Sequence, residues 1–352
     1  MIISRRQFLV LSAVEAGMLL AGCGSAPKKP ETLEKVVEET PTEKPAKPAV
    51  EEEDFTNLTE EQKLAKWFDY IDEVKKEMPK EFTGAEQLEY KGKIYAVLLN
   101  VSNEMDSLDF KYLFELERVY GSLEKLGVEK DNIAVLYDSK KTEAEAGFNE
   151  VQKHKAEEAR KTAEAIGALD ATVENLDKVF DEYEKIFTDD DILIFYVTGC
   201  NKVKDIEASA MDKELLKKGG MDHVLLFNYM KPLRNPNGTI KAKGKRITFL
   251  GHPGYGLFGM RIRHIDDIAA VNAAGLRKDY TITYNYSFLS TVAEAAARGA
   301  SVEQAVDYAR NEQQKILEYG QKLGLVEHTD EGANICTKAG EKPDFLTKKL
   351  KK

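Results

Sequence analysis

Two residues that could together carry out nucleophilic catalysis each follow an apolar segment. Cys200 comes shortly after the almost unbroken apolar run 192–197, and His252 comes shortly after the run 246–250. A thiolate is a strong nucleophile, and a nearby imidazolium favours the thiolate form. The same two residues are also compatible with a degenerate site, in which Cys200 packs as a small side chain and His252 is a loop residue. Both interpretations stay open.

A metal site is a third interpretation, in which His264, Asp266 and Asp267 join these two residues. Neither glycine-rich segment, 219–220 or 251–259, has the pattern of a phosphate-binding loop. We therefore predict no cofactor and no resident metal. The net charge of −10 argues against a nucleic-acid partner.

Strands that alternate with helices must position the two candidate residues. Apolar runs predict strands over 94–101, 133–137, 192–197, 246–250 and 268–273. Apolar residues at helical spacing predict helices over about 60–78, 109–126, 172–187, 286–298 and 302–318, the first begun by a capping box at Thr59. This alternation predicts an α/β fold, a three-layer α/β/α sandwich with a mostly parallel sheet. Cys200 then follows the carboxyl end of a buried strand, where such sheets usually carry their chemistry.

The N-terminus has the organisation of an export signal. Arg5 and Arg6 precede an apolar stretch over 8–20, which ends in Leu-Ala-Gly and Cys23. The paired arginines resemble a twin-arginine signal, and the final box resembles a lipoprotein cleavage site with lipid on the cysteine. We predict a signal peptide over 1–22, a lipid anchor at Cys23 and an extracytoplasmic, membrane-attached protein. An ordinary N-terminal anchor with a chance cysteine is the alternative.

The next segment, 23–54, is predicted to be a disordered tether. Half of the chain's ten prolines lie between Pro27 and Pro48, among lysine, glutamate and threonine. An N-terminal helix over 55–80 and a main domain over 85–345 should follow, with a solvated helical insertion at about 140–168. The chain's three cysteines are too few for a disulfide framework, and whether Cys200 pairs with Cys336 stays open.

Over roughly residues 90–318, the order of elements resembles the caspase-like fold of the clan that contains caspases, legumains and gingipains. Four segments carry the resemblance: KGKIYAVLLNVS, LERVYGSLEKLGVEKDNIAVLYD, NLDKVFDEYEKIFTDDDILIFYVTG and YSFLSTVAEAAARG. The resemblance implies that the third and fourth of the predicted strands are neighbours whose carboxyl ends face one cleft.

The chain departs from that family at both catalytic positions. The family's third strand ends in Thr/Ser-Gly-His-Gly, whereas here Cys200 replaces the histidine. The family's fourth strand ends in Ala-Cys-x-Ser-Gly, and alignment on Gly254 puts Gly251 at the nucleophile position and His252 one residue beyond it. The resemblance therefore implies that both catalytic residues are absent from their own places.

These observations predict a surface-tethered lipoprotein with a caspase-like domain, a catalytically inactive peptidase homologue that binds a peptide or protein. One alternative is an active cysteine-type endopeptidase that uses an exchanged dyad of Cys200 and His252. A structural envelope lipoprotein is the other alternative. The sequence does not determine the peptide preference or the oligomeric state.

Overall fold

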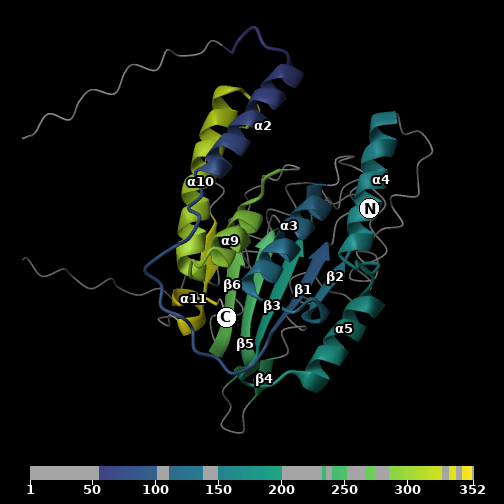
Figure 1. Cartoon of the computed structure of the whole chain (residues 1–352), viewed down its shortest axis with the longest axis vertical. Helices are drawn as coiled ribbons and strands as arrows, with labels where there is room; N and C mark the ends of the chain where they lie inside the picture. The colour runs from purple at the N-terminus through teal and green to yellow at the C-terminus, as the bar shows by residue number, and fades with distance from the viewer. Residues whose placement is uncertain are drawn as a thin grey trace, which may run out of the picture. The chain divides into compact units, whose positions relative to one another are not determined.

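The computed structural model describes residues 55–100, 111–137, 150–199, 232–234, 240–251, 266–273, 285–326, 333–337 and 343–350. Its centre is a β-sheet with helices against both faces (Figure 1). This arrangement is an α/β fold compatible with the predicted three-layer sandwich. None of the helices in these ranges is both long enough and apolar enough to span a bilayer.

The sheet is mostly parallel, as predicted. Its strands run in the order β2–β1–β3–β5–β6–β7, and the first five of these are parallel to one another. The short strands β7 and β4 pair antiparallel with β6 and β5, respectively. The strand bounds are β1 Ile94–Asn100, β2 Ile133–Leu136, β3 Ile192–Thr198, β4 Pro232–Arg234, β5 Ile240–Gly251, β6 Asp266–Asn272 and β7 Asn334–Cys336.

Seven α-helices lie within the described residues: α2 Glu60–Lys76, α3 Lys111–Leu126, α4 Glu150–Ala165, α5 Val173–Ile186, α9 Phe288–Ala297, α10 Val302–Lys322 and α11 Asp344–Thr347. A 3₁₀ turn over Lys130–Asn132 leads into β2. Five of these helices match the predicted ones to within a few residues. Capping explains several of the starts, because Thr59, Thr172, Ser287 and Ser301 each accept a hydrogen bond from a backbone N–H in the first turn.

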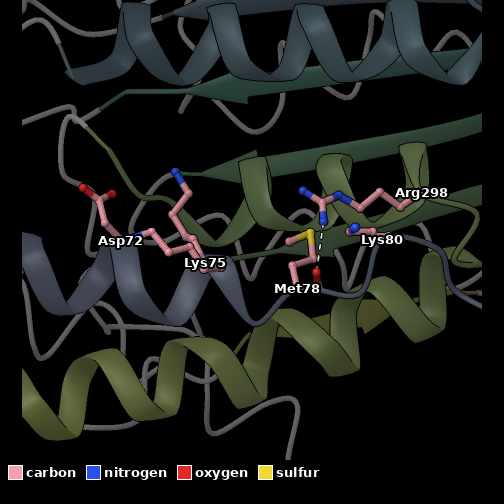
Figure 2. Close-up of a pocket in the computed structure, with 6 residues that line it drawn as sticks. Asp72, Lys75, Met78, Lys80 and Arg298 are labelled. Atoms are coloured by element: carbon pink, nitrogen blue, oxygen red, sulfur yellow. Dashed lines mark hydrogen bonds between the residues drawn. The ribbon is translucent and has the colours of Figure 1, made fainter.

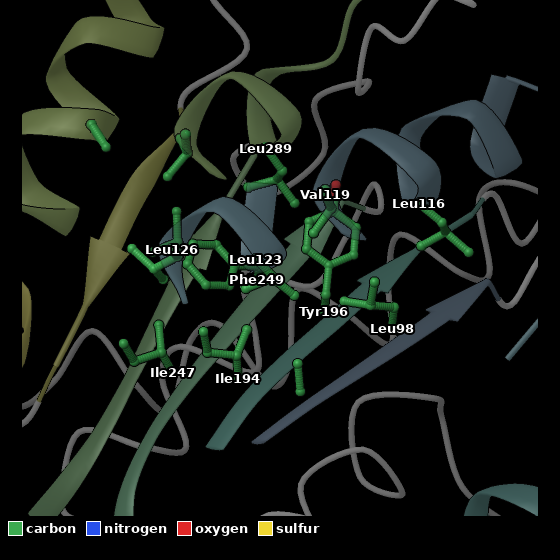
Figure 3. Close-up of a cluster of buried hydrophobic side chains, with 14 of the residues drawn as sticks. Leu98, Leu116, Val119, Leu123, Leu126, Ile194, Tyr196, Ile247, Phe249 and Leu289 are labelled. Carbon is green, nitrogen blue, oxygen red and sulfur yellow. The ribbon is translucent and has the colours of Figure 1, made fainter. Parts of the chain in front are cut away.

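The two central strands bury both of their faces. All seven residues of β1 and all seven of β3 are buried. Successive side chains of a strand point to opposite faces, so alternate residues enter two separate cores. Ile194 and Tyr196 pack toward α3 and α9 (Figure 3), whereas Phe195 packs edge-on against Phe180 of α5, with ring centroids 5.2 Å apart. A continuous apolar run is therefore what this position in the sheet requires.

Strand β5 is longer than the predicted segment 246–250. It begins at Ile240, and its first residues pair with β4 rather than with the central strands. Gly244, with φ of +67°, allows close approach to the turn before β3: a Cβ there would lie 2.5 Å from Phe187 Cε1 and 2.7 Å from the Asp191 carbonyl oxygen. Lysine, alanine and glycine dominate this part of the strand, so it carries no apolar signal.

Helix α2 packs along α10 (Figure 1). Trp67, which is 6 % exposed, donates a hydrogen bond from Nε1 to the carbonyl oxygen of Ile316 at 3.0 Å. The rings of Tyr70 and Tyr319 stack with centroids 4.1 Å apart. Trp67 therefore anchors the packing of α2 on α10.

Helix α4 occupies the second half of the predicted insertion 140–168. It packs against α3, and Ala156, Ala159 and Ala163 are buried in the main core. The rest of its sequence is rich in charged residues, which suits an exposed surface. These three alanines give close contact without large apolar side chains, so such a face is easily overlooked in the sequence.

Candidate functional site

The carboxyl ends of β1, β3 and β5 lie side by side at one edge of the sheet. The pairing register aligns Asn100 with Thr198, and Thr198 with Gly251. The predicted neighbourhood of the strands that precede Cys200 and His252 is therefore confirmed. Cys200 and His252 themselves lie outside the described residues, so their separation stays a prediction.

The strand order adds a second reason to look at this edge. From β1 the chain enters β2 on one side, and later enters β3 on the other side of β1. In open parallel sheets, ligands bind outside the carboxyl ends of the strands at such a switch point. Asn100 and Thr198, both buried, are the residues at which β1 and β3 reach it.

A buried carboxyl group on α3 accepts hydrogen bonds from the end of β3. Glu115 of α3 is 0 % exposed, and its two oxygens accept hydrogen bonds from two residues of β3. The Tyr196 hydroxyl donates to Oε1 at 2.6 Å, and the Thr198 hydroxyl donates to Oε2. Both hydroxyls are buried, so the carboxyl group replaces the water that they would otherwise bind. The arrangement fixes the strand immediately before the segment that carries Cys200.

Glu115 was not among the residues singled out in the sequence. It lies in Phe-Glu-Leu-Glu-Arg, within a helix that was predicted from the spacing of its large apolar side chains. Its spacing was a usable signal, because Glu115, Val119, Ser122 and Leu126 form one i, i+4, i+7, i+11 row, and all four are buried.

Glycines lie at the carboxyl ends of β3 and β5: Gly199 directly follows β3, and Gly251 is the last residue of β5. Gly199 has φ of +132°, which residues with a Cβ rarely adopt, whereas glycine takes this backbone conformation without strain. Gly251, at the position that the resemblance assigns to the nucleophile, is the last residue of β5. A glycine at this position has no side chain that could attack a carbonyl group.

The opposite edge of the sheet has buried polar groups with a structural role. Asp191, at the start of β3, accepts hydrogen bonds from the backbone N–H of Lys93 and of Thr188, both at 2.6 Å, and from the Thr188 hydroxyl at 2.8 Å. Arg246 forms an ion pair with Glu184 of α5 at 3.2 Å. These contacts join strands and helices, and they leave the carboxyl edge as the better candidate site.

Of the five residues in the metal interpretation, only Asp266 and Asp267 lie within the described residues, so the interpretation stays untested. Asp266 and Asp267 begin β6, whose amino end lies at the opposite edge of the sheet from Gly251. Seven strand residues span roughly 20 Å, so the backbone of Asp266 lies far from Gly251 along the strands. Within the described residues no group of three His, Cys, Asp or Glu side chains could hold a metal ion.

Cys336 lies on β7, where its sulfur accepts a hydrogen bond from the Asn272 side chain at 3.5 Å. Strands β5 and β6 separate β7 from β3, which amounts to three spacings or roughly 14 Å. Disulfide-bonded residues have Cα atoms about 4.4–6.8 Å apart. Cys200 lies outside the described residues, so whether it pairs with Cys336 stays open.

No protein-family model matches the chain, and no similar sequence was found among the curated proteins.

Proposed function

We propose that this protein is a lipid-tethered, extracytoplasmic lipoprotein with a caspase-like domain that has lost catalysis and binds a peptide at the carboxyl edge of its sheet. The anchor would be lipid on Cys23, and the segment 24–54 would hold the domain away from the membrane. The ligand would be an extended peptide or a protein segment, bound without cleavage.

The observation that carries this proposal is the alignment of Thr198 with Gly251 on neighbouring parallel strands. In the family that the sequence resembles, the catalytic histidine and the catalytic cysteine lie at the carboxyl ends of these two strands. Here β3 is followed in the sequence by Gly199 and Cys200. Strand β5 ends in Gly251, the glycine at the family's nucleophile position. Peptide hydrolysis of the family's kind needs a thiolate with a base beside it and oxyanion donors arranged around that thiolate. At the nucleophile position this chain has Gly251 and therefore no thiol.

A peptide-binding experiment tests the proposal. The full chain would be screened against a library of extended peptides for binding, and each bound peptide would be examined by mass spectrometry for cleavage. We expect binding without cleavage, and weaker binding when Gly251→Val places a side chain at the strand end. Absence of any binder, or binding that Gly251→Val leaves unchanged, would count against a peptide site at this edge.

The exchanged dyad is the second candidate, favoured by the same register. Neighbouring strands lie about 4.8 Å apart, so the residues that follow Thr198 and Gly251 start from adjacent backbone positions. A pairing of Cys200 with His252 would lower the thiol pKa below its ordinary value of about 8.5. Cys200 would then react with iodoacetamide at neutral pH, and His252→Ala would slow this reaction.

The alkylation rate against pH separates the two candidates. Rapid alkylation that is lost in His252→Ala, together with peptide cleavage that is lost in Cys200→Ala, would establish the dyad. Slow alkylation with an ordinary thiol profile would leave the inactive, peptide-binding domain.

A further inference from the structure

Glu312 is an acid buried where helices meet. It lies on α10, it is 3 % exposed, and neither of its side-chain oxygens has a hydrogen-bond partner within the part of the chain that the structure describes. An ionised carboxylate without hydrogen bonds is costly to remove from water. The packed state therefore favours the protonated form of this side chain.

Its position on the helix puts Glu312 beneath α2. Residues four apart lie on one face of a helix, so Glu312, Ile316 and Gly320 form a row along α10. The Ile316 carbonyl accepts the hydrogen bond of Trp67, and a Cβ at Gly320 would lie 3.0 Å from the Trp67 ring. This row is thus the surface on which α2 docks, and Glu312 is its acidic member.

The charged groups nearest to Glu312 come from three helices and the residue after one of them: Lys75 of α2, Glu77 after α2, Glu294 of α9, and Lys315 of α10 itself. Tyr308, one turn earlier on α10, has its own pKa raised to about 12 by burial and then by the charge of Glu312. Arg298, the residue after α9, and Arg118 of α3 lie next in this network, beside Glu294 and Lys75 respectively.

The nearby cations are held by other acceptors. Lys315 pairs with Glu77 at 2.6 Å, and Arg298 pairs with Glu294 at 2.5 Å. Lys75 donates to the Asn285 carbonyl at 2.9 Å. Burial raises the pKa of Glu312 to about 7, and the charge of Glu294 adds to this effect, whereas Lys75 and Lys315 oppose it without prevailing.

The end of α2 borders a surface hollow beside Arg298. A hollow of about 550 Å³ lies there, lined by Asp72, Lys75, Lys76, Met78, Lys80 and Arg298. Figure 2 shows Arg298, the residue after α9, directed toward the carbonyl of Met78, and this hydrogen bond is 3.1 Å long. Helix α2 and the residues after it are thus held both by α10 and by Arg298.

We propose that protonation of Glu312 controls how firmly α2 docks on α10. The reasoning rests on the buried, unpartnered carboxyl group on the docking face, and it is independent of the function at the carboxyl edge of the sheet. The docking of α2, the helix that follows the N-terminal 54 residues, thereby depends on pH. Release of α2 would uncover the row of Glu312, Ile316 and Gly320 on α10.

The direction of the effect follows from linkage. When α2 is displaced, water reaches Glu312 and its pKa returns toward the ordinary value of 4.5, whereas in the docked state it is about 7. The docked state binds more protons between these values, so docking is strongest below pH 4.5 and weakens as the pH rises through 7. The docking equilibrium constant falls by up to roughly 300-fold across this interval.

Trp67 is the only tryptophan of the chain and reports docking directly. Acrylamide quenching of its fluorescence would be measured on the full chain from about pH 5 to 9, with far-UV circular dichroism to confirm that the domain stays folded. We expect quenching to increase through one transition as the pH rises from about 5 to 7, and to change little above 7. The transition should be absent in Glu312→Gln and kept in the control Glu318→Gln, an exposed acid on the same helix.

A second variant keeps Glu312 and changes its surroundings. Lys75→Gln removes a cation that favours ionised Glu312, so the midpoint should move to higher pH. Flat quenching of the parent over the whole range would overturn the proposal. A transition that survives in Glu312→Gln, or a midpoint that fails to rise in Lys75→Gln, would also overturn it.

Discussion

Glu115→Ala tests whether the carboxyl edge of the sheet depends on a buried acceptor. The substitution leaves the Tyr196 and Thr198 hydroxyls, both buried, without the oxygens that now accept from them. Each unsatisfied buried group costs about 1–3 kcal/mol, and the lost side chain leaves a small cavity. Release of a buried carboxyl group offsets part of this cost. We expect a loss of about 4 kcal/mol in the free energy of unfolding.

The two donors can be removed separately to apportion that loss. Tyr196→Phe and Thr198→Val each delete one hydroxyl with little change in shape, and each should cost about 1.5–3 kcal/mol. The two hydroxyls share one carboxyl group, so the double variant leaves Glu115 with neither of them. It should cost more than the sum of the single variants, with a coupling of about 0.5–3 kcal/mol.

Urea unfolding followed by circular dichroism and by Trp67 fluorescence measures these differences. Glu117→Ala is the matched control, because Glu117 is an exposed acid two residues along the same helix. It should change stability by no more than about 0.5 kcal/mol. A loss below about 1 kcal/mol in Glu115→Ala, indistinguishable from that of the control, would refute the reasoning.

Other sites provide independent tests of the same structure. Asp191→Ala removes the acceptor of two backbone N–H groups and should lower the free energy of unfolding by about 2–5 kcal/mol, whereas its exposed neighbour in Asp190→Ala should not; equal effects in urea unfolding would contradict this role. Gly320→Ala places a Cβ 2.7 Å from Val326 Cγ2 and should cost about 1–3 kcal/mol, with a rise in acrylamide quenching of Trp67; an unchanged melting temperature would argue against this packing of α2. Cys23→Ser should release the protein from membranes or leave its signal segment unprocessed, and an unchanged membrane fraction with unchanged mass would remove the lipid anchor.

The sequence alone determined the elements that bury continuous apolar surface. β1 and β3 were predicted almost to the residue, because a strand buried on both faces needs an unbroken apolar run. The start of α2 was also predictable, because the capping box at Thr59 is a local motif whose partners lie within four residues. The strands β4 and β7, of three residues each, were missed, since so short a segment shows no period.

Only the tertiary structure decided which polar residues are buried. Glu115 and Glu312 are glutamates on helices, ordinarily exposed, and what covers each of them comes from elsewhere in the chain. The alignment of Thr198 with Gly251 likewise depends on the strand order, which no local pattern specifies. The sequence named Cys200 and His252 as reactive residue types, but their chemistry depends on a distance, and a distance is set by the fold.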